Sequence, residues 1–141
     1  MKKSIFAAAF AAALMMSCGS TKNVTDIAAL DGEWSIVEVS GTKINPGDAE
    51  TAPFIGFDSK KSNLYGCTGC NQLTGTLKAD AQKGTIDFSQ TGSTRMMCAD
   101  MKVERMVLDA LNKATRYQLN GNGGMTLNDN SGKPVIVLKK K

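Results

Sequence analysis

The stretch Asn63-Leu-Tyr-Gly-Cys-Thr-Gly-Cys-Asn-Gln-Leu-Thr-Gly-Thr-Leu77 holds two short candidate strands around a glycine-rich turn. The strands are residues 63–67 and 73–77, and the turn is centred on Gly66 to Cys70. Two short strands joined by a tight turn are typical of antiparallel sheets, whereas parallel strands need a long crossover segment. This stretch therefore favours an antiparallel fold.

The same pattern of short strands and turn residues continues on both sides of this stretch. Turn signals recur every 8–12 residues or so, as in antiparallel β-domains. The apolar residues between Trp34 and Val39 alternate imperfectly, which predicts a first strand with a slight irregularity. The other candidate strands are residues 54–57, 85–88, 117–119, 125–127 and 135–138, and the last two predict a C-terminal hairpin across the turn at residues 129–132.

One segment, Asp100 to Ala114, has a helical period instead. Its apolar residues fall on one face at i, i+3, i+4, i+7 and i+8, and Asp100 is a candidate N-cap. The apolar face comprises Val103, Met106, Val107, Ala110 and Leu111. We therefore expect an α+β fold: a single compact domain with a curved, barrel-like antiparallel sheet and one packed α-helix.

The N-terminal segment indicates where the protein works. Lys2 and Lys3 precede an alanine-rich apolar run of about 12 residues, too short to span a bilayer, which ends at Ser17 and Cys18. This layout predicts a lipoprotein signal peptide over residues 1–17, cleavage after Ser17 and acylation of Cys18. An ordinary secretory signal that leaves Cys18 unmodified is the alternative. Two lipid attachments would anchor the chain far more firmly than one.

The mature chain would then consist of a tether and one domain. Residues 18–29 are largely polar and predict a flexible tether, followed by the domain at residues 30–141. Gly19, rather than aspartate, follows the acylated cysteine, which favours the outer membrane, and the periplasmic face is expected because no acidic run follows. We expect a monomer.

Charge argues against a nucleic-acid partner. Without Lys2 and Lys3 the chain carries 15 basic and 13 acidic residues, too small an excess for a nucleic-acid footprint. The basic cluster Lys139–Lys141 predicts a solvated tail after the last strand, with attraction to anionic lipid headgroups as the alternative.

The sequence lacks residues that several kinds of catalytic site require. The chain contains no histidine, which excludes Ser-His and Cys-His nucleophiles and His-ligated metals. The carboxylates are scattered, and we predict that Glu104 forms an ion pair with Arg95. Met96 and Met97, near Met101, are expected to pack in the core, with a soft-metal or oxidation-sensitive patch as the alternative. We expect no enzyme activity, cofactor or metal.

Three cysteines fall in the expected domain, Cys67, Cys70 and Cys98, in a compartment where disulfides persist. Sequence permits three pairings. Cys70–Cys98 is favoured because closing the long intervening loop would contribute roughly 3–4 kcal/mol, which would leave Cys67 as a free thiol. Cys67-Thr-Gly-Cys70 also matches the C-x-x-C redox pattern, although no helix follows to lower the thiol pKa.

These motifs together resemble the META domain of HslJ-like lipoproteins. The resemblance covers roughly residues 30–138 and rests on a series of short motifs in the same order. They are Leu30-x-Gly-x-Trp34, Pro53–Asp58, Gly66–Asn71, Gly75, Thr94-Arg-Met-Met-Cys98, Glu104 and Leu111. The resemblance implies a small β-rich envelope domain with one helix and a disulfide between the positions of Cys70 and Cys98. Cys67 stands where the family usually lacks cysteine.

We therefore expect a non-catalytic, lipid-anchored envelope protein that binds a partner protein or an apolar ligand and supports the envelope under stress. One alternative is a pilot or chaperone lipoprotein that shelters an acyl chain or peptide in the curved sheet. The other is a thiol redox protein that uses Cys67 and Cys70.

Overall fold

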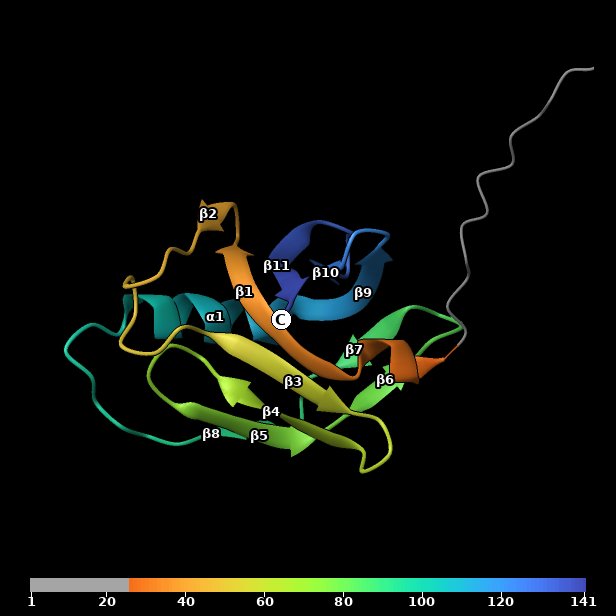
Figure 1. Cartoon of the computed structure of the whole chain (residues 1–141), viewed down its shortest axis with the longest axis horizontal. Helices are drawn as coiled ribbons and strands as arrows, with labels where there is room; N and C mark the ends of the chain where they lie inside the picture. The colour runs from red at the N-terminus through yellow and green to blue at the C-terminus, as the bar shows by residue number, and fades with distance from the viewer. Residues whose placement is uncertain (1–25) are drawn as a thin grey trace, which may run out of the picture.

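The computed structural model describes residues 26–141, which form one curled antiparallel sheet with a single α-helix (Figure 1). A short 3-10 helix, η1 (Ile27–Leu30), precedes the sheet, and α1 (Lys102–Lys113) follows eight of the strands. The strands are β1 (Gly32–Val39), β2 (Thr42–Lys43), β3 (Phe54–Asp58), β4 (Asn63–Cys67), β5 (Gln72–Thr76), β6 (Lys78–Asp80), β7 (Thr85–Asp87), β8 (Thr91–Ser93), β9 (Ala114–Asn120), β10 (Gly124–Asp129) and β11 (Pro134–Lys140). The expected α+β class and curved antiparallel sheet are confirmed.

The order of the strands explains why the sheet curls. It is β6-β7-β9-β10-β11-β1-β3-β4-β5-β8, with β2 paired to β1, and every pairing is antiparallel. β5 and β6 lie near opposite ends of this order, yet only Leu77 separates them along the chain. The chain therefore draws the two ends of the sheet together into a half-barrel.

The first strand contains the irregularity that its sequence predicts. The register of β1 against β11 shifts between Ile36 and Glu38, which marks a β-bulge. Trp34, Ile36 and Val39 are buried on the inner face despite the uneven spacing of these residues. The indole of Trp34 donates a hydrogen bond to the Leu30 carbonyl oxygen at 2.7 Å, which joins η1 to the sheet.

The helix covers the sheet at β1 and β11, where its apolar face is buried (Figure 1). Val103, Val107, Ala110 and Leu111 are buried as the helical period predicts, whereas Met106 is only half-buried at the edge of the core. The helix starts later than expected: Met101, not Asp100, is the N-cap residue. The Asp100 carboxylate still accepts a hydrogen bond from the Lys102 backbone N–H at 2.8 Å.

The hollow side of the sheet is filled by apolar side chains from almost every strand. The side chains exposed by 1 % or less include Leu30, Val39, Ile55, Phe57, Leu64, Val107, Met125, Leu127, Ile136 and Leu138. Because these residues pack together in one cluster, the concave face forms the hydrophobic core of the domain.

Two predictions about the ends of the domain are wrong. The tether was expected to reach residue 29, but Ile27–Leu30 form η1, and the Asp26 carboxylate accepts a hydrogen bond from the Ala28 N–H at 2.8 Å. The three final lysines are not a free tail, because Lys139 and Lys140 belong to β11 and pair with β1. The Lys141 ammonium forms an ion pair with Glu33 at 2.9 Å.

The predicted signal peptide (residues 1–17), cleavage after Ser17 and acylation of Cys18 lie outside the described residues. Within residues 26–141, no helix has the length and hydropathy needed to cross a membrane.

Candidate functional site

The most unusual group in the described chain is a buried carboxylate, Glu104, in the first turn of α1. Its side chain is only 3 % exposed. Oε2 accepts hydrogen bonds from the Thr68 hydroxyl at 2.6 Å and from the Cys70 and Asn71 backbone N–H groups at 3.1 Å each. Oε1 accepts a bond from the Asn71 side-chain amide at 3.0 Å. A buried charge is costly unless it is paired or hydrogen-bonded, and these four donors meet that requirement.

The glycines of the turn after β4 allow the backbone to reach this carboxylate. A side chain at Gly66 would collide with the Phe54 carbonyl oxygen on the neighbouring strand β3. Gly69 has φ +121°, and a β-carbon there would lie 3.3 Å from Val103 and 3.5 Å from the Glu104 nitrogen. The turn can therefore pack directly against the first turn of the helix, where its N–H groups face the Glu104 side chain.

The environment of Glu104 keeps it ionised. Burial raises the pKa of Glu104, but the hydrogen bonds from Thr68, Asn71 and Cys70 oppose this effect and bring the pKa below its ordinary value. Because all these groups donate, the ionised form is the one that fits. The carboxylate acts as an acceptor that holds the turn to the helix.

Asn71 extends this network to the segment after β8. Its side chain, 3 % exposed, accepts hydrogen bonds from the Met96 N–H at 2.6 Å and the Thr94 hydroxyl at 2.8 Å. The Asn71 amide also lies 3.2 Å from the Met96 carbonyl oxygen. We call Glu104, Thr68, Asn71 and Thr94, with the backbone groups that they bind, the Glu104 cluster.

A disulfide closes the same region. Cys70 and Cys98 are bonded at an S–S distance of 2.00 Å with 6.1 Å between their α-carbons, the pairing that the sequence favours among three. Cys67 is a free thiol, 1 % exposed at the end of β4. The redox alternative required Cys67 and Cys70 to act together, but here Cys70 is bonded to Cys98 and Cys67 is shielded from solvent.

Two sequence predictions at this site are wrong. Glu104 does not pair with Arg95, because its carboxylate faces the buried turn while Arg95 is exposed. Met96 and Met97 do not pack in the core: they are 52 % and 88 % exposed and are the large hydrophobic residues that the described part of the chain leaves exposed. The backbone of Met96 is fixed to Asn71, which leaves its side chain at the surface.

Local sequence patterns do not mark Thr68, Asn71 and Thr94 as site residues, and the predicted partner of Glu104 is wrong. A signal for Glu104 was available. It lies three residues before Val107 and seven before Leu111, so it falls on the apolar face of the helix. A carboxylate at such a position needs buried donors, and the polar turn at residues 68–71 supplies them. The spacing between the two segments, more than 30 residues, hides this match from local patterns.

Residues 26–141 contain no group of three or more His, Cys, Asp or Glu side chains placed to hold a metal ion. Hollows among the described residues include one between β6 and β7 (about 250 Å³), one beside the end of α1 (about 390 Å³) and one at Thr42–Asp48 near the start of α1 (about 320 Å³). Each is bounded partly by charged or polar residues. The concave face, where an acyl chain would have to lie in the chaperone alternative, is filled by the core.

Fold and site together define a half-barrel domain in which a buried acidic residue and a disulfide secure the loops at one end. The chain belongs to the META domain family, whose model matches residues 25–141.

Solved structures show the same fold. The chain is similar to a protein from Burkholderia xenovorans solved by NMR (22 % identity, TM-score 0.61), with 80 % of this chain and 84 % of that one covered. It is also similar to a DUF4847 family protein from Bacteroides vulgatus (crystal structure, 18 % identity, TM-score 0.58; 79 % and 94 % covered). A further NMR structure matches at 22 % identity and TM-score 0.59 (78 % and 89 % covered). No curated protein matches the sequence.

Proposed function

We propose that this META domain protein is anchored by lipid on Cys18 at the periplasmic face of the outer membrane and acts there by binding a partner rather than by catalysis. The observation that carries the proposal is the Ser17-Cys18 junction, placed after an apolar signal and only eight residues before the first described residue, Asp26. Such an arrangement holds the domain close to the membrane.

The state of the chemically active groups supports a binding role. Glu104, the buried carboxylate, accepts four hydrogen bonds from the protein itself. Cys70 is bonded to Cys98, and Cys67 is buried. Glu104 and Cys70 are therefore committed to holding the fold, and Cys67 is shielded from solvent. The family resemblance favours a role in envelope maintenance under stress.

Membrane fractionation of the wild-type chain and of Cys18→Ala tests the anchor. We expect the wild type in the outer-membrane fraction with a mass that includes the acyl groups, and the variant in the soluble periplasmic fraction. Added protease should degrade the wild type only after the outer membrane is opened. Equal membrane association of the two chains would contradict lipid anchoring, and cleavage by protease in intact cells would contradict the periplasmic face.

A further inference from the structure

The segment after β8 is held to the domain at alternate residues. The Thr94 hydroxyl and the Met96 N–H both bind Asn71 Oδ1, and Cys98 is bonded to Cys70. The residues between these three fixed points, Arg95 and Met97, are exposed. We call residues 94–98 the tip segment. Although it has no regular secondary structure, its backbone is fixed by side chains of the core.

The tip segment presents apolar surface that the fold does not need. Met97 is 88 % exposed and Met96 is 52 % exposed, whereas Met125 is fully buried. Methionine and arginine are both enriched at protein interfaces, where a few apolar anchors supply most of the affinity. A loop whose backbone is already ordered loses little further conformational freedom on binding. The tip therefore has both an anchor and the rigidity that tight binding favours.

The tip and the first turn of α1 carry exposed cations. Arg95, Lys102 and Arg105 are exposed, and none of the three forms an ion pair within residues 26–141. Asp100 accepts the Lys102 backbone N–H and, with Asp48, lines the hollow beside Lys102, so the cation of the tip itself is Arg95. A partner that seats Met97 would bring its surface close to Arg95, so carboxylates on its rim would be favoured and cations disfavoured.

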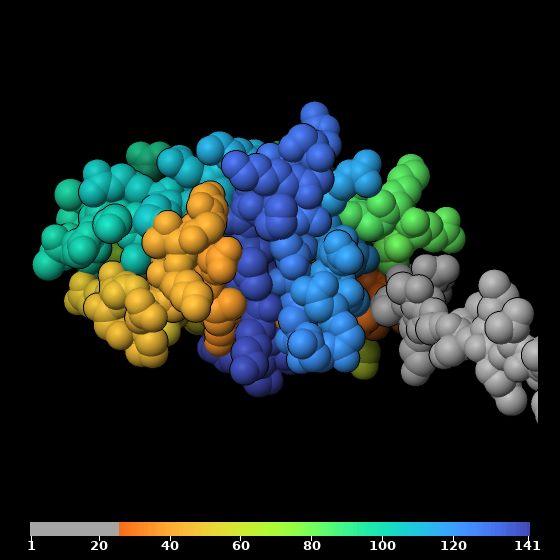
Figure 2. Space-filling view, turned by 90° about the horizontal axis from the view of Figure 1, so that it is seen from above, coloured from red at the N-terminus to blue at the C-terminus, as the bar shows by residue number. Residues whose placement is uncertain are grey.

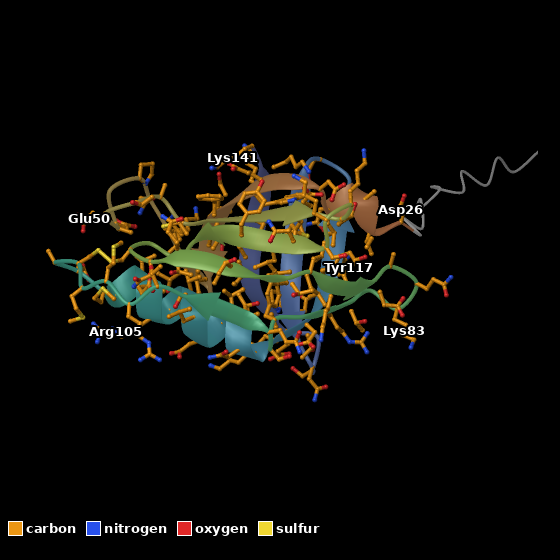
Figure 3. All side chains as sticks on the ribbon, turned by 90° about the horizontal axis from the view of Figure 1, so that it is seen from below. Asp26, Glu50, Lys83, Arg105, Tyr117 and Lys141 are labelled. Atoms are coloured by element: carbon orange, nitrogen blue, oxygen red, sulfur yellow. A yellow bond between two sulfur atoms is a disulfide. The ribbon has the colours of Figure 1, made fainter. Side chains whose placement is uncertain are left out.

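The tip lies at the end of the molecule away from the start of the described chain. Figure 1 shows α1 and the loop before it at one end of the long axis and η1 at the other. The space-filling view agrees: residues near 100, in teal, and the first described residues, in dark orange, are at opposite ends (Figure 2). Arg105 lies at the tip's end of the molecule and Asp26 at the other (Figure 3). A chain anchored before Asp26 thus has its tip free to face away from the membrane.

We propose that the tip segment is a docking surface for a partner protein, which accepts Met97 in an apolar pocket bordered by carboxylates. This inference rests on the proposed binding function and names the surface that performs it. A protein fits better than a lipid surface because the tip is opposite the anchored end.

Site-specific photocrosslinking in cells that make the full chain tests the proposal. Benzoylphenylalanine replaces Met97 in one chain and Lys83 in a matched control. Lys83 is exposed on the β6–β7 turn, at the same end of the molecule as Asp26 (Figure 3). We expect a discrete protein adduct from position 97 that is absent from position 83. Mass spectrometry then identifies the captured protein and the residues that were crosslinked.

Binding of the purified captured protein to the mature chain supplies the quantitative test. We expect Met97→Glu to weaken binding by about tenfold or more and Met97→Leu to retain it, because the two changes differ mainly in charge. Arg95→Glu should slow association, most strongly at low salt. Lys83→Glu should bind like the wild type.

Several outcomes would overturn the proposal: no adduct from position 97, an adduct with lipid or a second copy of this chain only, or equal binding by Met97→Glu and wild type. The experiments distinguish failure of the proposed lipid anchor from failure of the proposed docking surface. A Cys18→Ala chain that leaves the membrane but still binds the purified partner contradicts only the anchor. A membrane-bound Met97→Glu chain with unchanged affinity for the partner contradicts only the assignment of the tip segment as the docking surface.

Discussion

The meander of β9, β10 and β11 and the region from Cys67 to Met101 are held together in different ways. In the meander, Met125, Leu127, Ile136 and Leu138 are fully buried in an apolar core. The other region contains the three-residue strands β6, β7 and β8, and it also contributes Leu73, Leu77, Ile86 and Phe88 to the core. Its irregular segments, the turn after β4 and residues 94–98, are fixed instead by buried polar groups and a disulfide. Apolar burial is non-directional, whereas a hydrogen-bonded network specifies one arrangement. The comparison shows how a small domain can give an irregular loop a definite shape.

Leu127→Ala should lower the stability most, because it removes a buried side chain from the apolar core of the meander. Leu127 is fully buried, so its loss leaves a cavity that costs about 2–5 kcal/mol of unfolding free energy. Urea denaturation would measure the loss. The cost should be the same between pH 5 and 8, since no titrating group is involved. A loss below about 1 kcal/mol would show that the meander is not packed as described.

The paired substitution Cys70→Ala and Cys98→Ala should have the next largest effect. The two residues are 28 positions apart, and removing a bridge over such a loop costs about 3–4 kcal/mol in the chain-entropy model. Thermal unfolding with and without a reductant would check it. Reductant should lower the midpoint of the wild type toward that of the double variant and leave the variant unchanged. A wild type that is indifferent to reductant would contradict the expectation.

Glu104→Gln tests the Glu104 cluster. It should lower the free energy of unfolding by about 2–3 kcal/mol, since hydrogen bonds to a charged acceptor are lost. The pKa of Glu104 in the folded chain lies below its ordinary value of 4.5. The stabilisation is therefore complete above pH 4.5 and is lost as the pH falls through the lowered pKa. Denaturation at several pH values should show the two chains converging in acid. The matched control is Glu50→Gln, an exposed carboxylate, which should change little at any pH.

Lys140→Met should have the smallest effect. The Lys140 ammonium lies 4.4 Å from the centre of the Trp34 ring, and exposed contacts of this kind contribute about 0.5–1 kcal/mol. The exposed neighbour Lys139 serves as the control, and Lys139→Met should be neutral. Equal unfolding midpoints for the two variants would show that the cation over the ring contributes nothing.

The sequence predicts the meander more completely than the region from Cys67 to Met101, because the meander is specified by local patterns. The alternation in residues 125–127 and 135–138 and the turn at Asp129 are local signals, and the predicted hairpin forms there as β10 and β11. β2, β6 and β8 have two or three residues each, too few to show any period. β2 and β6 pair with the strand next to them along the chain, whereas β8 pairs with β5 across the intervening β6 and β7, a contact that no local pattern records.

The candidate site also divides into features that local sequence predicts and features that depend on contacts far apart in the chain. The favoured cysteine pair could be argued from loop length, but the roles of Glu104 and Asn71 depend on a contact between segments 33 residues apart. Met96 and Met97 were assigned to the core on their apolar character alone. Their exposure follows from the Asn71 bonds to the Met96 backbone, which no hydrophobic pattern records.

Amide hydrogen exchange in the wild type and in Glu104→Gln tests most directly the claim that this carboxylate holds one end of the domain. We expect much faster exchange at Cys70 and Asn71 in the variant, because their N–H groups lose the carboxylate that accepts them. Exchange at Met96 should also rise, because its acceptor, the Asn71 side chain, is held in place by Glu104. Exchange at Leu127 in the meander should change far less. An equal acceleration at all four amides, or none at Met96, would contradict it.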